Sequence, residues 1–258
     1  MPTKAIIAIP ARLASQRLPR KMLLAETGRP LVEHTWRNAA QATQAAGVVV
    51  VTDDPEIQAT VEGFGGQVVM TSPEASSGTA RIVEALPHLP AADIVVNLQG
   101  DEPELPAAAI DAAIACLEQC PEAGVATLVS PLRSTAGLHN PAVVKAVLTP
   151  ATGGTNPVVW RAITFSRAAV PAARDWDDEL LAASPPLYWQ HIGVYAYRRS
   201  VLEQWDALPP SRLATLESLE QLRLVEAGVP IVAAAVEHAA RGIDTAEDYS
   251  EFVARQQG

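Results

Sequence analysis

The chain has 258 residues, 48% hydrophobic and 19% charged, a composition typical of a globular protein and not of a disordered one. Nineteen Lys and Arg against 29 Asp and Glu give a net charge of −10. Such an acidic chain is a poor candidate for binding nucleic acid through its phosphates or for coating anionic membranes. No segment approaches the roughly 20 apolar residues of a membrane span, and the first apolar run is too short for a signal-peptide core. Because Cys116 and Cys120 alone make no disulfide framework, we expect a cytoplasmic protein without membrane insertion.

The first half of the chain alternates predicted strands with predicted helices. Continuous apolar runs bounded by turn residues predict buried parallel strands at residues 5–9, 48–51, 68–70 and 93–98. Capping residues and helical periodicity predict helices at residues 30–46, 55–64, 78–86 and 106–119. This alternation indicates an α/β domain with a mostly parallel sheet and right-handed crossovers.

The alternation is lost from about residue 124 onward. Strands are predicted at residues 125–129, 143–148, 162–166, 194–197 and 231–236, with few helices between them. Helices are predicted at 216–226 and at 244–256, the second capped by Asp244 or Thr245. Since no clear linker separates the two halves, we expect one compact unit with an inserted second lobe.

The loop after the first strand is strongly basic. Five cations precede Glu26, the first acid of the chain: Lys4, Arg12, Arg17, Arg20 and Lys21. In an acidic protein this segregation suggests an anion site, and a basic loop after a strand suits a polyphosphate. The loop is neither a Walker A loop nor a glycine-rich dinucleotide fingerprint. On composition alone, a solvated charged loop explains it equally well.

Two aspartates and one helix start form the other candidate features. Asp101 follows the strand at 93–98, where a carboxylate can hold Mg²⁺ or simply stabilise a turn. Asp244 precedes the last helix, where a plain helix cap is the simpler interpretation unless the fold brings it beside Asp101. The segment 77–79 can bind a nucleobase edge or a phosphate, or merely cap its helix. In α/β sheets ligands bind beyond the carboxyl ends of strands, so these residues point to one crevice.

Seven short blocks occur in order along nearly the whole chain: Pro10 to Lys21, Ser77 to Arg81, Gln99 to Pro103, Phe165 to Ala168, His191 to Tyr195, Leu216 to Arg223 and Gly242 to Thr245. Together they resemble the 3-deoxy-manno-octulosonate (Kdo) cytidylyltransferases, also called CMP-Kdo synthetases. The sequence departs from that pattern at Ala75 and Ala80, where family members usually have a histidine and an acid, and it matches poorly over residues 150–161.

The resemblance implies an α/β fold of the nucleotide-diphospho-sugar transferase type, a Rossmann-like mixed sheet with a smaller inserted lobe for sugar binding and dimerisation. Residues of about 1–123 and 229–258 would form the nucleotide-binding core, and about 124–228 the lobe. The implied reaction transfers CMP from CTP to the anomeric hydroxyl of Kdo, releases pyrophosphate, needs Mg²⁺ and serves lipopolysaccharide synthesis. The implied assembly is a homodimer.

The resemblance also assigns roles to residues by motif match. The nucleotide would be bound by Ala11, Arg12, Arg17, Lys21, Ser77, Gly78, Thr79 and Asp101. The catalytic set would be Lys21, Arg17, Asp101 and Asp244, with both aspartates holding Mg²⁺ and both cations stabilising the departing pyrophosphate. The sugar would be bound by Gln99, Arg167, His191, Tyr195, Glu217 and Gln221.

Three alternatives remain open. The same chemistry could act on an amino-substituted octulosonate or on a nonulosonate such as sialic acid. A nicotinamide dehydrogenase could use a similar sheet, although the glycine fingerprint is missing. A non-catalytic nucleotide sensor would bind CTP without releasing pyrophosphate.

Overall fold

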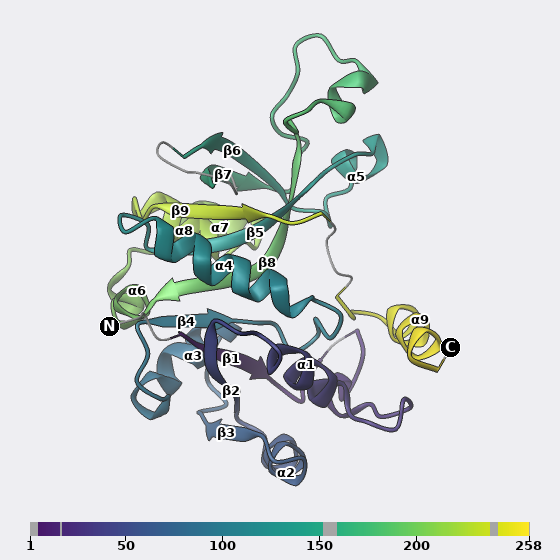
Figure 1. Cartoon of the computed structure of the whole chain (residues 1–258), viewed down its shortest axis with the longest axis vertical. Helices are drawn as coiled ribbons and strands as arrows, with labels where there is room; N and C mark the ends of the chain where they lie inside the picture. Colours follow the sequence, from purple (N-terminus) through teal and green to yellow (C-terminus); the bar gives the residue numbers. More distant parts are fainter. Residues whose placement is uncertain (1–4, 16, 152–158, 238–241, 258) are drawn as a thin grey trace. The chain divides into compact units, whose positions relative to one another are not determined.

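The computed structural model describes residues 5–15, 17–151, 159–237 and 242–257. The chain divides into two compact units, which are described separately (Figure 1). Unit 1 comprises Met1–Asp111, Arg198–Glu203 and Ala240–Gly258, and unit 2 comprises Ala112–Tyr197 and Gln204–Ala239. Within the described ranges no helix is long and apolar enough to cross a bilayer.

The sheet of unit 1 is parallel throughout, as the apolar runs predict. Its strands are β1 (Ala5–Ala11), β2 (Ala45–Thr52), β3 (Gln67–Met70) and β4 (Ile94–Asn97), in the order β3-β2-β1-β4. Ile9 pairs with Val50 and Ile7 with Val96, and all four side chains are fully buried. A parallel sheet covered on both faces requires such uninterrupted apolar strands.

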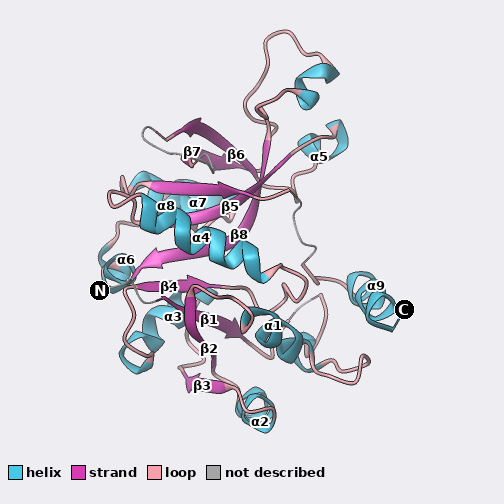
Figure 2. Cartoon of the chain, viewed as in Figure 1, coloured by secondary structure: helices cyan, strands magenta, loops and turns pink. Residues whose placement is uncertain are grey.

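The helices of unit 1 are α1 (Leu31–Ala39), α2 (Pro55–Gly63), α3 (Gly78–Ala85), the first turn of α4 (Ala107–Gln119), α6 (Arg199–Glu203) and α9 (Ala246–Gln257). They include three that pack on this sheet, α1, α2 and α3 (Figure 2). The predicted cap of α2 is confirmed, because the Asp54 carboxylate accepts from the backbone N–H groups of Glu56 and Ile57. The strand order runs outward from β1 to β3 and then returns to β4, so the switch point of the sheet lies between β1 and β4.

The helix predicted over residues 30–46 is wrong in its second half. The structure ends α1 at Ala39 and begins β2 at Ala45. The carboxylate of Asp111 accepts from the backbone N–H of Thr43 at 3.0 Å, from its hydroxyl at 2.8 Å and from the N–H of Gln44 at 2.8 Å. These bonds hold a turn that the alanine-rich local sequence does not reveal.

Unit 2 has a mixed sheet. Its strands are β5 (Val125–Pro131), β6 (Lys145–Pro150), β7 (Trp160–Ser166), β8 (Trp189–Arg198) and β9 (Ile231–Ala235). β5 lies between β8, which is antiparallel to it, and β9, which is parallel. β7 joins β9 to β6, and β6 also pairs with the start of β8. Thus β9 pairs inside unit 2, although the sequence resemblance groups it with the nucleotide-binding core. Most of the poorly matching segment 150–161 lies outside the described residues.

The helix predicted over residues 216–226 is confirmed only in part, because it is interrupted at residues 218–220. Two short helices are present instead, α7 (Arg212–Glu217) and α8 (Gln221–Glu226), with α5 (Thr135–His139) elsewhere in the unit. Ser218 separates them with a φ of 51°, a left-handed conformation that stops a right-handed helix. Leu216, expected on an apolar face, is 81% exposed, and this break places Glu217 beside the end of β7.

Candidate active site

A cavity of about 630 Å³ in unit 1 lies beyond the ends of β1 and β4, at the switch point of the sheet. Its walls are Pro10, Arg12, Ala14, Ser15, Arg17, Lys21, Met22, Gln99, Gly100, Asp101 and Asp244. The basic loop therefore lines a pocket, where it faces the two candidate aspartates. Arg12 has no ion pair or hydrogen bond with any described residue, so its charge is available to a ligand.

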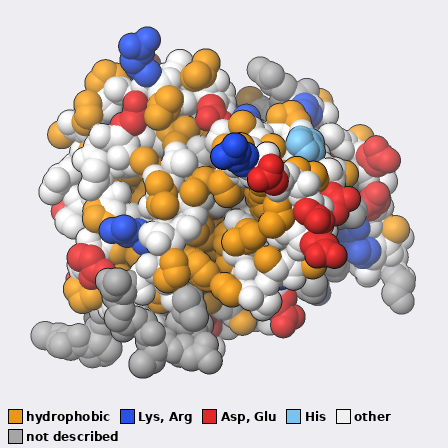
Figure 3. Space-filling view, turned by 90° about the horizontal axis from the view of Figure 1, so that it is seen from above, with side chains coloured by type: hydrophobic (Ala, Val, Ile, Leu, Met, Phe, Trp, Pro, Cys, Tyr) orange, Lys and Arg blue, Asp and Glu red, His pale blue; other side chains and the backbone are white. Residues whose placement is uncertain are grey.

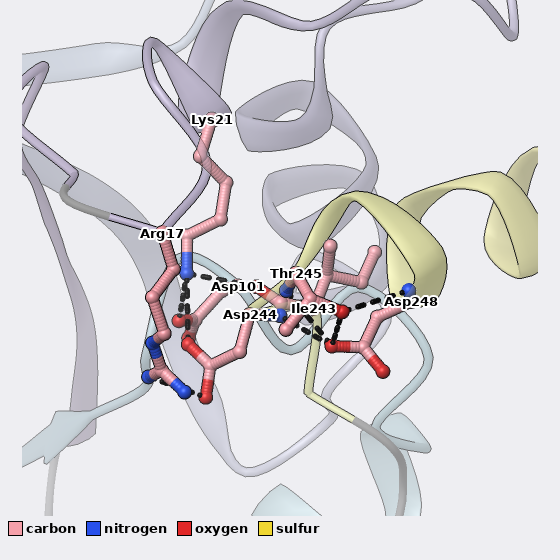
Figure 4. Close-up of polar contacts among 7 residues, drawn as sticks. All are labelled: Arg17, Lys21, Asp101, Ile243, Asp244, Thr245 and Asp248. Carbon is pink, nitrogen blue, oxygen red and sulfur yellow. Dashed lines mark hydrogen bonds and ion pairs between the residues drawn. The ribbon is translucent and has the colours of Figure 1, made fainter.

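Lys21 lies at the centre of the site, in the short 3₁₀ turn Lys21–Leu23 (Figure 4). Its ammonium is almost fully buried and donates to Asp101 Oδ2 at 2.6 Å, to the Ile243 carbonyl at 2.8 Å and to Asp244 Oδ1 at 3.3 Å. The other oxygen of Asp244 lies 3.0 Å from the Arg17 guanidinium. The fold thus brings the two aspartates, far apart in the sequence, to a single cationic group.

The carboxylate of Asp244 is not a helix cap. Thr245 caps α9: its hydroxyl accepts from the Asp248 N–H at 3.1 Å, and Asp248 Oδ2 accepts from the N–H of Thr245 at 2.8 Å. Asp248 Oδ2 also accepts from the Asp244 N–H at 3.1 Å. This reciprocal capping box leaves the Asp244 side chain turned toward Lys21, as Figure 4 shows.

Glu102 is a member of the site that sequence alone did not single out. Its Oε2 is buried without a hydrogen-bond partner among the described residues. Burial, and then the negative charges of Asp101 and Asp244, raise the pKa of this carboxyl to about 8. Its position next to Asp101 is the sequence feature that could have identified Glu102 as a site residue. The sequence does not show that Gly242 packs closely against it: a Cβ there would lie 3.1 Å from Glu102 Oε1.

Two carboxylates can share one cation here. Asp101 and Asp244 both reach the point that Lys21 Nζ occupies, whereas Glu102, with its raised pKa, is mostly protonated and uncharged at neutral pH. In the part of the chain that the structure describes, no group of three or more His, Cys, Asp or Glu side chains is arranged to hold a metal ion.

The predicted nucleobase segment lies at the edge of the same pocket. A Cβ on Gly78 would lie 3.1 Å from the Pro10 ring and 3.7 Å from Gln99 Oε1, so this helix start packs against both pocket loops. The Ser77 hydroxyl accepts from the Ala80 N–H at 3.1 Å and so caps α3. Thr79 is buried and bonded to Asn97, and Ala11 is a buried residue of β1. None of these contacts tests their predicted role with a nucleotide.

Gly100 is required where the two pocket loops meet. A Cβ at this position would lie 2.9 Å from Met22 Sδ, which would have to move, and 3.2 Å from the Pro10 carbonyl, tighter than most real Cβ contacts. Glycine therefore lets the loop that carries Asp101 pack directly on the basic loop.

Five of the six predicted sugar-binding residues lie in unit 2, whereas Gln99 lines the pocket of unit 1. Glu217 accepts from the Ser166 hydroxyl at 3.0 Å and from the Arg167 N–H at 2.6 Å. The Arg167 guanidinium donates to backbone carbonyls, at 2.6 Å to Glu217 and at 3.0 Å to Pro141. Arg167 and Glu217 are thus held rigidly at the end of β7.

The other three are uncharged at neutral pH: His191 and Gln221 are buried, and Tyr195 is partly buried. The His191 ring lies 5.5 Å from that of Tyr195 and 4.9 Å from that of Phe165. Burial lowers the pKa of His191 to about 3 and raises the pKa of Tyr195 well above its ordinary value, so both are uncharged at neutral pH. Gln221 is buried, and its Nε2 has no hydrogen-bond partner among the described residues.

A parallel sheet with a cation-lined pocket at its switch point defines an α/β nucleotidyltransferase. The family model for cytidylyltransferases matches residues 6–231. The chain is 48% identical over 253 residues to the 3-deoxy-manno-octulosonate cytidylyltransferase of Rhodopirellula baltica, covering 98% of each chain. It is 42% identical over 249 residues to 3-deoxy-manno-octulosonate cytidylyltransferase 1 of Actinobacillus pleuropneumoniae, covering 94% of this chain and 95% of the relative. The solved structure of CMP:2-keto-3-deoxy-manno-octonic acid synthetase complexed with CTP matches with a TM-score of 0.87 and 37% identity over 99% of both chains.

The chain belongs to the cytidylyltransferase family, among the 3-deoxy-manno-octulosonate cytidylyltransferases. The resemblance drawn from seven sequence blocks is confirmed, and so is the nucleotide-diphospho-sugar transferase fold. The residue roles implied by the motifs stay predictions.

Proposed function

We propose that this chain transfers CMP from CTP to the anomeric hydroxyl of Kdo and releases pyrophosphate. The observation that carries the proposal is the convergence of Arg17, Lys21, Asp101 and Asp244 in one pocket at the switch point of the sheet. The activated sugar suits a glycosyltransferase of lipopolysaccharide synthesis. Two free, buried cysteines and a nucleoside triphosphate substrate favour the cytoplasm as its location.

The chain's own residues position the nucleotide and stabilise charge. Arg12, which is free of protein partners in the described ranges, binds phosphate oxygens at the pocket mouth. Lys21 and Arg17 lie where they can stabilise the negative charge that develops on departing pyrophosphate. Such transfer requires positioning and charge stabilisation more than covalent chemistry by the protein.

Asp101 and Asp244 are proposed to hold Mg²⁺. The fit rests on two oxygen donors that reach a common point and on the orphaned, buried Oε2 of Glu102 beside them. Bound Mg²⁺ supplies Lewis-acid polarisation of phosphate and lowers the pKa of a coordinated hydroxyl. Lys21 Nζ occupies that point here and compensates the two carboxylates, so the ammonium would have to move toward the substrate phosphates when the metal binds.

Pyrophosphate release tests the proposal directly. Purified protein is incubated with CTP, Kdo and Mg²⁺, with each component omitted in turn, and the other product is identified as CMP-Kdo by mass spectrometry. Release that requires all three components is expected. Release with sialic acid or an amino-Kdo in place of Kdo assigns the alternative substrate, and CTP binding without release identifies a nucleotide sensor.

A homodimer is proposed through the apolar surface of unit 2. Figure 3 shows hydrophobic side chains gathered over the middle of one face. An apolar groove in unit 2 is lined by residues that include Trp160, Pro171, Leu187 and Trp189, and the Leu187 side chain is half exposed. Such a patch on a soluble surface marks an interaction site. Leu187→Asp is expected to shift the sedimentation coefficient from dimer to monomer, whereas a wild-type monomer contradicts this assembly.

A further inference from the structure

The antiparallel pairing of β5 with β8 is interrupted beside His191. Thr127 pairs with Tyr195, but the next residue of β5, Leu128, pairs with Ile192. Gly193 and Val194 therefore bulge out of the ladder, and their neighbouring carbonyls need other donors. The side chain of Thr127 meets this need: its Oγ1 lies 2.7 Å from the Val194 carbonyl and 3.2 Å from the Ile192 carbonyl.

The same hydroxyl lies 3.0 Å from Nε2 of His191. A threonine hydroxyl has a single proton, and both carbonyls can only accept it. Once that proton is directed to the bulge, the hydroxyl oxygen can bond to His191 only as an acceptor. The imidazole must then carry its own proton on Nε2, which leaves a lone pair on Nδ1.

Nδ1 has no hydrogen-bond partner among the described residues, although the ring lies against Phe165 and Tyr195 and His191 is 9% exposed. Burial keeps the ring neutral, since it lowers the pKa of His191 to about 3. A neutral ring with an Nδ1 lone pair accepts a hydrogen bond from a hydroxyl and offers nothing to a carboxylate.

We propose that Thr127 is a positioning residue that fixes His191 as the Nε2–H tautomer, so that Nδ1 accepts a hydrogen bond from a hydroxyl of the sugar. The identity of the sugar rests on the proposed function, whereas the tautomer does not. In this arrangement His191 accepts a hydrogen bond from a sugar hydroxyl and does not bind the carboxylate. The carboxylate of the sugar is bound by a cationic side chain instead.

Nitrogen NMR of the histidine-labelled wild-type protein tests the tautomer without any substrate. The chain has five histidines, so the His191 signals are assigned as those missing from a His191→Gln sample. We expect a protonated, pyrrole-type Nε2 and a pyridine-type Nδ1 that moves when Kdo is added. A protonated Nδ1 in the wild-type protein overturns the proposal, even if the enzyme releases pyrophosphate.

Two variants separate positioning from mere packing. Thr127→Val keeps the shape but removes the acceptor, and we expect mixed His191 tautomers, a KM for Kdo raised about 10-fold and an unchanged KM for CTP. Thr127→Ser keeps the hydroxyl and is expected to restore the wild-type spectrum and KM. If Thr127→Val leaves the His191 spectrum and the KM for Kdo unaltered, Thr127 does not position His191. If the wild-type enzyme releases no pyrophosphate from CTP and Kdo, the proposed function fails while the spectrum still reports the tautomer.

Discussion

The pocket of unit 1 and the polar cluster of unit 2 handle charge in opposite ways. In unit 1, three cations face two carboxylates around one cavity, and Arg12 and Arg17 are solvent-exposed. In unit 2, the side chains of Arg167 and Glu217 form hydrogen bonds to backbone groups. His191 of the same unit is buried and uncharged at neutral pH. The exposed cations of unit 1 are therefore open to a charged ligand, whereas the guanidinium of Arg167 and the carboxylate of Glu217 already have protein partners in unit 2.

The largest loss of activity is expected when the charge of Lys21 is removed from the unit 1 cavity. Lys21→Ala removes the ammonium shared by Asp101 and Asp244, and we expect kcat to fall by about 100-fold or more. Initial rates of pyrophosphate release at saturating CTP and Kdo measure this. Arg20→Ala is the matched control, because Arg20 pairs with Glu56 and lies outside the walls of the cavity. Near-wild-type turnover of Lys21→Ala contradicts its catalytic role.

The second effect distinguishes a metal ligand from a helix cap. Asp244→Asn is expected to lower kcat about 10- to 100-fold at low millimolar Mg²⁺ and to raise the Mg²⁺ requirement, without changing the melting temperature of the unliganded protein. Asp248→Asn, its control in the capping box, should weaken α9 by about 1 kcal/mol and leave the Mg²⁺ dependence unchanged. Rate measured against Mg²⁺ concentration separates the two. Wild-type activity of Asp244→Asn at low Mg²⁺ excludes the two-carboxylate site.

A smaller, selective effect is expected in unit 2. Arg167→Ala should raise the KM for Kdo about 10-fold and leave CTP affinity nearly intact, since an acidic sugar needs a cation near its carboxylate. Arg161→Ala, on the same strand but exposed, is the control. If Arg167→Ala weakens CTP binding instead, Arg167 belongs to the nucleotide site.

The last prediction concerns how Glu102 makes the stability of the folded protein depend on pH. The folded pKa of Glu102, about 8, lies above its ordinary value of 4.5, so the folded protein binds this proton more tightly than the unfolded chain. The resulting stabilisation is complete below pH 4.5 and is lost as pH rises to 8. Glu102→Gln should therefore melt several degrees above wild type at pH 9 in EDTA and show a much smaller difference at pH 5. Glu62→Gln, on the exposed face of α2, should show no difference between the two pH values.

The sequence predicted the features that are determined by neighbouring residues and missed those that depend on distant segments. Apolar runs identified β1 and β2, because an uninterrupted run has few alternatives in an α/β chain. The sequence placed Asp101 and Asp244 in the site by motif resemblance, but it could not decide whether Asp244 or Thr245 caps α9. Asp111, Glu102 and Thr127 escaped notice because each acts through backbone or burial that the fold supplies from distant segments.

The backbone of Ile243 joins two walls of the unit 1 cavity, since its N–H donates to the Asp101 carbonyl at 2.9 Å and its own carbonyl accepts from Lys21 at 2.8 Å. One residue therefore joins the basic loop to the loop after β4. Ile243 is made by the ribosome after Lys21 and Asp101, so a growing chain lacks this joint until residue 243 has been added. A nascent chain accordingly acquires the completed arrangement of Lys21 and the two aspartates only after Asp244 has been synthesised, 143 residues after Asp101.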